Sequence, residues 1–311
     1  MKRLIFFCLI LSFFAPYAPV LAQSNDEGTG LLGDNFSLEG ALEAFKVATS
    51  MENFETLLNE EDRAINNLDL NDDGEIDYLR VEDHMEGDVH AIVIQALISE
   101  DESQDVAVIE IEKTGDESAV LQIVGDEYLY GKDVFVEPFE EVGTSDGKGG
   151  PSADYRVTRI VINVWAWPSV RFVYAPNYVV YRSPFRWRVY PRAWRPWRPL
   201  TWNVYRGKRV HYGLNYRYVN THRVVGARKI YTPKRRSSTV VVKKSKTVKV
   251  RNNNGNTVVK KQTQTTKVKK NKNGNVTGKK TTKTKKVKKG KNGTKGKKVT
   301  KTKKVKRKSG N

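Results

Sequence analysis

The fold is decided by two consecutive runs of strand-forming residues, Val89-His90-Ala91-Ile92-Val93-Ile94-Gln95-Ala96-Leu97-Ile98 and Val106-Ala107-Val108-Ile109-Glu110-Ile111-Glu112. Both runs are rich in Val and Ile, which favour extended chain. Shorter runs of the same kind lie on either side, at Tyr78–His84 and Val120–Val124. Turn segments such as Glu86-Gly87-Asp88 separate the runs, so the pattern predicts four strands joined by successive hairpins.

The residues before these strands have the period of helices. Ser37 is a plausible N-cap, and apolar residues follow it at helical spacing as far as about Glu60. Ser50 restarts the pattern, which therefore predicts one or two amphipathic helices. Helices followed by a strand meander predict an α+β fold, with a small two-layer head in which the helices cover one face of an antiparallel sheet.

Charge divides the chain at the segment Gly147–Asp154. All 35 carboxylate residues lie at or before Asp154, whereas 47 of the 55 Lys and Arg residues follow it. The net charge of +20 therefore averages two opposed regions. The Gly, Ser and Pro content of the segment predicts a linker between an acidic head and a basic half.

The N-terminus has the features of a secretory signal peptide. Lys2 and Arg3 precede an apolar stretch, and a small residue, Ala22, stands before polar Gln23. The stretch is short and broken by Pro16 and Pro19, which argues against a membrane anchor. Cleavage after Ala22 would remove Cys8, the only cysteine. We therefore expect export to the periplasm or the cell surface, with no transmembrane helix and no disulfide in the mature chain.

The composition predicts six consecutive regions. They are a signal peptide (1–22), a flexible N-terminus (23–36), an acidic α+β domain (37–142), a linker (143–154), an Arg-, Trp-, Tyr- and Pro-rich belt (155–233), and a basic low-complexity tail (234–311).

Prolines recur in the belt, at Pro168, Pro176, Pro184 and Pro191. This rhythm excludes a continuous helix and predicts short edge strands or extended chain. Around 185–189 aromatic and apolar residues alternate with arginines, as on the two faces of a strand. Guanidinium groups bind phosphates and carboxylates, and aromatic rings stack on sugars or bases. The belt residues that we predict to bind a polyanion are Arg186, Arg188, Arg192, Arg195, Arg198, Trp187, Trp194 and Trp197.

The tail contains an internal repeat. Gly255, Gly274 and Gly293 are each 19 residues apart, each follows an Asn, and Lys-, Thr- and Val-rich runs lie between them. One interpretation is a chain of hairpins with Asn-Gly turns. The other is a disordered polycation, because the repeat offers little apolar surface to offset the entropy of ordering. The composition favours disorder.

Oxygen-bearing side chains alternate in Asp69-Leu70-Asn71-Asp72-Asp73-Gly74-Glu75-Ile76-Asp77, with glycine at the sixth position. The segment resembles the calcium loop of EF-hands and, more closely, the D-x-N-x-D-G-x-x-D loop of dockerins. The resemblance implies a weak calcium site with side-chain ligands Asp69, Asn71 and Asp73, the Glu75 carbonyl, and Asp77. Arg80 stands where an EF-hand has its bidentate Glu. The alternative is an Asp-Gly turn solvated by its own carboxylates.

Other chemistry is sparse in the sequence. His84 and His90 flank one predicted turn and could face each other, but two histidines without a third ligand are weak evidence for zinc. The chain has no Ser/His/Asp motif, phosphate-binding glycine loop or metalloprotease helix. We therefore predict no catalytic residue and no enzymatic activity.

Four segments carry a wider resemblance. They are Asn67–Asn71, Gln104–Glu110, Ile123–Glu127 and Pro168–Pro176. In these segments the chain resembles uncharacterised secreted proteins of Bacteroidetes-type bacteria. The resemblance implies export but no particular biochemical activity.

These features predict an exported, envelope-associated protein whose basic half binds a polyanion such as phosphorylated lipid, acidic polysaccharide or extracellular DNA. The acidic head is an additional, intramolecular partner for the basic tail. An alternative is a nucleic-acid-compacting protein with a histone-like Lys-rich tail, which requires an uncleaved cytosolic form. A hydrolase would require activity in the head.

Overall fold

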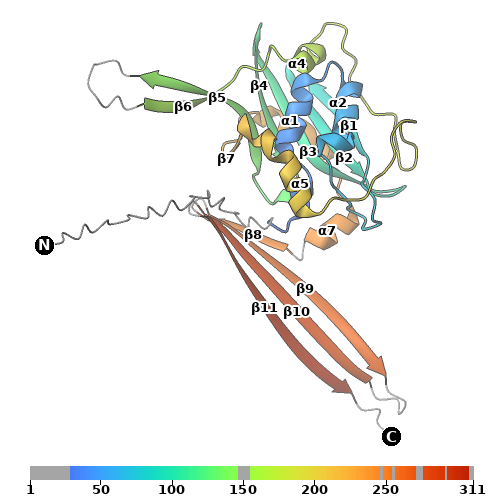
Figure 1. Ribbon diagram of the computed structural model, residues 1–311. Coiled ribbons are helices and arrows are strands. Elements are labelled where there is room, and N and C mark those ends of the chain that lie inside the picture. Colours follow the sequence, from blue (N-terminus) through green and yellow to red (C-terminus); the bar gives the residue numbers. More distant parts are fainter. Residues whose placement is uncertain are drawn as a thin grey trace, which may run out of the picture.

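The computed structural model describes residues 29–145, 155–245, 248–253, 256–270, 276–290 and 293–307. The predicted signal peptide, residues 23–28 of the predicted flexible N-terminus and residues 146–154 of the predicted linker lie outside these ranges. The described chain has an α+β fold built on a seven-stranded antiparallel sheet, and a second, four-stranded sheet lies near the C-terminus (Figure 1).

The two helices that the sequence predicts are present, as α1 (Leu38–Val47) and α2 (Met51–Leu58). The Ser37 hydroxyl accepts a hydrogen bond from the Gly40 amide at 3.0 Å, and the Ser50 hydroxyl accepts one from the Asn53 amide at 3.1 Å. Each serine thus satisfies one of the amides that a helix N-terminus leaves unpaired.

The four predicted strands are also present, as β1 (Leu79–Glu86), β2 (Val89–Leu97), β3 (Ser103–Gly115) and β4 (Ser118–Gly125). β2 ends one residue earlier than predicted, and β3 and β4 extend beyond the predicted runs at both ends. They pair in sequence order as an antiparallel meander. The register brings Glu86 opposite Val89, so the first hairpin turns at Gly87, whose φ is +58°.

The sheet does not end where the sequence predicts the linker. It continues through β5 (Phe135–Ser145) and β6 (Tyr155–Val161), and β7 (Tyr216–Val219) pairs with β5. The first residues of the predicted linker therefore belong to β5, and the belt supplies two strands of the sheet. The belt is not a separate region but completes the fold of the head.

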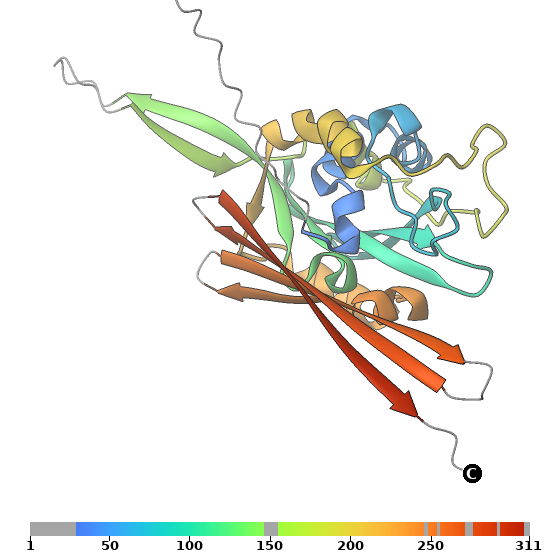
Figure 2. The same cartoon turned by 60° about the horizontal axis from the view of Figure 1, so that its bottom comes forward.

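Helices cover both faces of the sheet, whereas the predicted two-layer head has helices on one face only. On the face that we call the apolar face, α1, α2 and α4 (Pro168–Val173) contribute to the main core. The strand residues of this face include Val81, Ile92, Ile94, Ile109, Ile111, Leu121 and Ile123. On the opposite face, α6 (Val225–Tyr231) packs on β1, β2 and β3. Figure 2 shows the helices α1 and α2 on one side of the sheet and the orange C-terminal helices on the other.

We call this second face the polar face, because charged and amide side chains share it with small apolar ones. Cross-strand neighbours on it include Ala91, Val93, Gln95, Asp105, Val108, Glu110, Gln122 and Glu137. Only a small second core forms here, in which Ala91, Val93 and Val108 meet Val224 and Ala227.

The belt contains more helix than its prolines predict. Pro168 opens α4, where its missing N–H costs nothing, and α5 (Trp202–Arg209) follows a long irregular segment. Trp167 is buried at the start of α4, and Trp165 and Phe172 pack against the main core. The predicted strand alternation at 185–189 is wrong. Arg186 and Val189 close a tight turn in which Arg188 has a φ of +60°.

The tail is not disordered in its described residues. It begins with α7 (Thr239–Ser245) and continues as an antiparallel sheet of β8 (Val248–Asn253), β9 (Asn256–Lys270), β10 (Val276–Gly290) and β11 (Gly293–Arg307). The 19-residue repeat gives the last three strands equal length. β10 therefore pairs along almost its whole length with β9 and with β11, and these ladders satisfy the backbone N–H and C=O groups. The strand order agrees with the hairpin interpretation, although most residues of the predicted Asn-Gly turns lie outside the described ranges.

Candidate functional site

The predicted calcium loop, which we call the acidic loop (Asp69–Asp77), binds its own backbone. The two carboxylate oxygens of Asp69 accept hydrogen bonds from the Asp73 amide at 3.1 Å and the Gly74 amide at 3.0 Å. The left-handed φ values of Asp72 (62°) and Gly74 (86°) make the sharp bend that permits these bonds. This is the turn chemistry of an Asp-Gly loop.

The other predicted ligands are occupied in a similar way. The Asn71 Oδ1 accepts a hydrogen bond from the Asp73 amide at 3.0 Å, and one Asp73 oxygen accepts a hydrogen bond from the Glu75 amide at 2.9 Å. The buried Asp77 carboxylate accepts a hydrogen bond from the Leu70 amide at 2.6 Å. Burial, reinforced by Asp69 and Asp73, raises the pKa of Asp77 to about 8.

These contacts do not assemble a cation cage. Within the described ranges, no group of three or more His, Cys, Asp or Glu side chains is placed to hold a metal ion. Arg80, at the twelfth position of the pattern, turns to Glu82 at 3.1 Å instead of facing the loop. Calcium binding therefore remains a prediction that rests on the sequence pattern.

His84 and His90 do not face each other across the turn, which agrees with the weak sequence evidence for zinc. His84 lies opposite Ala91, and His90 lies opposite Met85, so the two imidazoles project from opposite faces of the hairpin. His90 is fully buried on the apolar face, with its Nδ1 at 2.8 Å from an Asp83 oxygen.

The acidic loop touches the basic half at two points. The Ile76 amide donates a hydrogen bond to the Trp197 carbonyl at 2.9 Å. The Lys244 amino group of α7 donates to the Leu70 carbonyl at 2.6 Å and lies 2.7 Å from an Asp72 oxygen. The two predicted sites, for a cation and for a polyanion, are therefore neighbours in the fold.

The second predicted site is an irregular segment, residues 185–200, which we call the arginine–tryptophan loop. Its aromatic side chains gather around the buried Tyr78 ring, with centroid distances of 5.7 Å to Phe185, 5.3 Å to Tyr190 and 5.0 Å to Trp194. The Leu200 amide donates a hydrogen bond to the Asn67 side chain at 2.7 Å. These contacts anchor the loop to the acidic half.

The arginines of this loop remain at the surface. Arg186, Arg188, Arg192, Arg195 and Arg198 are all exposed. Arg195 donates hydrogen bonds to the carbonyls of Arg192 and Trp194, and Arg188 lies 5.9 Å from the Trp187 ring centroid. Among the residues that the structure describes, none of the five arginines pairs with a carboxylate. Trp187, Trp194 and Trp197 are half-buried.

Other arginines of the basic half are used to hold the fold. Arg217 and Arg223 lie 2.7 Å and 2.6 Å from the two oxygens of Glu137, a fully buried carboxylate on the polar face. Arg235 binds Asp126 and Glu127, each at 2.6 Å. The contact between head and basic half is thus a set of buried or half-buried ion pairs.

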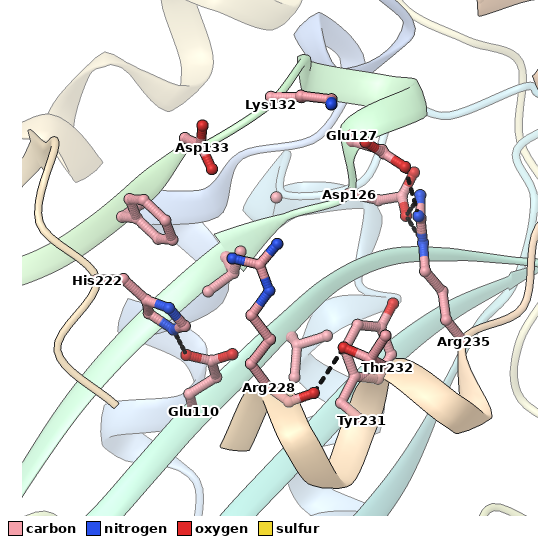
Figure 3. A pocket seen from close by; sticks show the side chains of 14 residues that line it. Glu110, Asp126, Glu127, Lys132, Asp133, His222, Arg228, Tyr231, Thr232 and Arg235 are labelled. Atoms are coloured by element: carbon pink, nitrogen blue, oxygen red, sulfur yellow. Dashed lines mark hydrogen bonds and ion pairs between the residues drawn. The ribbon is translucent and has the colours of Figure 1, made fainter. Parts of the chain in front are cut away.

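One pocket on the polar face was missed by the sequence analysis (Figure 3). Val108 and Glu110 of β3, Phe135 of β5, and His222 and Arg228 are among its lining residues. The His222 Nε2 lies 2.5 Å from a Glu110 oxygen, and the imidazole stacks on Phe135 at 4.9 Å. Burial raises the pKa of Glu110 to about 7, against the opposing effect of His222.

Comparison with known proteins gives no relative: no family model, no curated protein and no solved structure matches the chain. The proposed resemblance to secreted bacterial proteins stays a prediction. Sequence spacing offers no signal for the pocket, because Glu110 and His222 are 112 positions apart.

Proposed function

We propose that this protein is an exported, non-enzymatic, envelope-associated protein that binds polyanions through its basic half. The observation that carries the proposal is the arginine–tryptophan loop, where five exposed arginines lie on an anchored segment without carboxylate partners. Arginines that serve the fold, such as Arg217 and Arg223, are paired. The difference supports a role of the loop arginines in binding an external anion.

The environment of the aromatic rings favours charge recognition over base or sugar recognition. Trp194 packs edge-on against Tyr78 and Tyr190, and Trp197 packs against Trp194, so these rings hold the loop in place. An aromatic ring that packs against other rings leaves less of its surface free to stack on a base or sugar. Phosphate or sulfate groups, which guanidinium forks bind, are therefore the groups that the loop suits best.

The candidate targets share this chemistry. Phosphorylated outer-membrane lipid, acidic polysaccharide and extracellular DNA all present closely spaced anionic groups. The Lys-rich strands of the tail add positive charge without sequence preference. None of the helices in the described part of the chain is long and apolar enough to cross a membrane.

A salt titration with a short DNA duplex as the probe tests this proposal on the full chain. Changing the five loop arginines to Gln should flatten the dependence of log affinity on log salt, because each lost phosphate contact removes about 0.9 from the slope. For comparison, a second variant changes five tail lysines, at 279, 283, 285, 288 and 297, to Gln, which removes the same charge from the tail. An unchanged affinity and slope in the arginine variant would refute a role for the loop.

The predicted contact between head and tail involves the first residues of the tail. The first tail residues are already bound, since Arg235 pairs with Asp126 and the Ser238 and Thr239 hydroxyls donate hydrogen bonds to Glu102. These contacts are part of the fold. Competition between head and ligand is therefore expected only for the later lysines, beyond α7.

Calcium remains a second element of the proposal, at the acidic loop. We expect millimolar calcium to raise the thermal midpoint of the full chain slightly, because a weak ligand near its Kd adds about 0.4 kcal/mol. Asp73→Ala should abolish the increase, and Asp88→Ala, in a turn outside the loop, should retain it. Identical melting curves with calcium and with EDTA would contradict calcium binding.

A further inference from the structure

The pocket on the polar face shares no lining residue with the arginine–tryptophan loop. It has a volume of about 380 Å³ and opens between β3, β4 and the chain segment 222–235 that crosses them. Such a volume lies at the lower end of the range of ligand sites. The acidic half supplies its floor and the basic half one of its walls.

The floor of the pocket is apolar. Val108 and Phe135 are almost fully buried side chains, and Val124 lies opposite both of them in the sheet register. The three side chains share one face because cross-strand partners point the same way. A short hydrocarbon group is the natural occupant of this part of the cavity.

Most of the charged groups around the pocket are already neutralised. Glu110 pairs with His222, while Asp126 and Glu127 both bind Arg235 (Figure 3). These groups form two compact units, one at each end of the cavity. They fix the walls, and because Arg235 serves two carboxylates, one negative charge remains in excess at its end of the cavity.

Three charged side chains have no such partner. Arg228 projects from α6 into the space between the two units, and Lys132 and Asp133 lie on the opposite rim (Figure 3). All three are exposed, and within the described ranges none makes a side-chain hydrogen bond or ion pair. Arg228 thus faces Lys132 and the Asp133 carboxylate across an apolar floor.

We propose that this pocket binds a small organic monoanion, a carboxylate attached to a short apolar chain. The Arg228 guanidinium receives the carboxylate and Lys132 adds a second positive charge, because a planar fork matches the two carboxylate oxygens. The hydrocarbon part covers Val108, Val124 and Phe135.

The charge count selects a monoanion over a phosphate dianion or a polymer. Asp133 offsets one of the two unpaired cations, and a second anionic charge on the ligand would meet it at the rim. The volume of about 380 Å³ suits a single small molecule, whereas the exposed arginines at 186–198 suit a chain of charges.

A nuclear magnetic resonance titration of the full chain tests the proposal with acetate, butyrate, hexanoate and inorganic phosphate as probes. We expect saturable shifts around Arg228 and His222. Hexanoate should bind at least about tenfold more tightly than acetate, because its chain is four methylenes longer and each buried methylene adds roughly 0.8 kcal/mol. Tighter binding of phosphate than of hexanoate would overturn the choice of a monoanion.

Two neighbouring substitutions supply the matched pair. Arg228→Gln should weaken hexanoate binding at least about tenfold, the typical range for a charged hydrogen bond. Lys229→Gln removes the same charge from the same helix outside the pocket and should leave the affinity within about twofold. An equal loss in both variants, or shifts that never saturate, would overturn the proposal.

Discussion

The two faces of the seven-stranded sheet are covered by different physical means. The apolar face packs Ile, Leu and Val against α1 and α2, which immediately precede the strands in the sequence. The polar face is covered by residues 221–238, which reach it from the far end of the belt and bind through ion pairs. One face is held by local hydrophobic packing and the other by distant charge pairs.

This difference shows how the opposite charges of the two halves are used. Carboxylates of the acidic half, such as Glu137 and Asp126, are buried where arginines of the basic half reach them. Burial of a single charge would be costly, and a partner compensates for much of that cost. The charge division in the sequence is therefore in part a division of complementary surfaces within one fold.

The largest effect is expected when the chain is truncated after residue 154, because this removes the residues that cover the polar face. We expect residues 23–154 alone to lose cooperative thermal unfolding, because β6, β7 and the partners of Glu137 are missing. The matched control ends at Ser245, which removes only the four-stranded tail sheet and should keep a cooperative transition. A cooperative melt of 23–154 with the stability of the full chain would show that the apolar face suffices.

The apolar face is tested by Phe54→Ala. Phe54 is fully buried and packs edge-on against Phe45 at 5.2 Å. We expect the free energy of unfolding to fall by about 3–5 kcal/mol, as for other buried Phe truncations. Denaturant titration measures the change in the free energy of unfolding. The control is Val225→Ala, because the Val225 side chain is half-exposed. A loss below about 1 kcal/mol would indicate that this face is loosely packed.

The ion pairs of the polar face are tested by Glu137→Gln. The substitution keeps the shape of the side chain but leaves Arg217 and Arg223 without their shared carboxylate. Because both arginines are partly exposed and can rehydrate, we expect a loss of about 2 kcal/mol. A double-mutant cycle with Arg223→Gln should show coupling. Additive losses would mean that the pairs do not hold this face.

A smaller effect concerns the pH dependence of stability. Burial raises the pKa of Glu110 from 4.5 to about 7, so the folded state binds this proton more tightly than the unfolded state. Its contribution to the free energy of unfolding is therefore greatest below about pH 4.5 and decreases as the pH rises to about 7.

Glu110→Gln should remove this slope, which cannot exceed about 1.4 kcal/mol per pH unit for one proton. Glu112→Gln, on the same strand and face, is the control and should leave the slope unchanged. Chemical denaturation at a series of pH values measures both. Parallel profiles for wild type and Glu110→Gln would exclude a raised pKa.

The local features of the fold could be predicted from the sequence. The caps at Ser37 and Ser50 and the strands at Val89–Leu97 and Ser103–Gly115 depend on residues close in the chain. The irregular Trp194–Leu200 segment also agrees with the extended conformation that its prolines predict.

The remaining features depend on contacts between distant residues. The pairing of β7 with β5, and of His222 with Glu110, joins positions about 80 and 112 apart. The alternating pattern at 185–189 predicts a strand, but packing of Phe185 and Tyr190 on Tyr78 draws this segment into a turn. Repeated Lys charges predict a disordered tail, whereas the equal strand lengths allow a paired ladder.

The late position of the polar-face cover in the chain has a kinetic consequence. Strands β1 to β4 form hairpins between neighbours, but Glu137 meets Arg217 and Arg223 only after loops of 80 and 86 residues close. Closing a long loop before its contacts form slows folding. A chain that folded from its N-terminus would leave Val93, Val108 and Glu137 uncovered until these loops close. How long that state persists depends on when residue 238 becomes available, and it sets the risk of aggregation during folding.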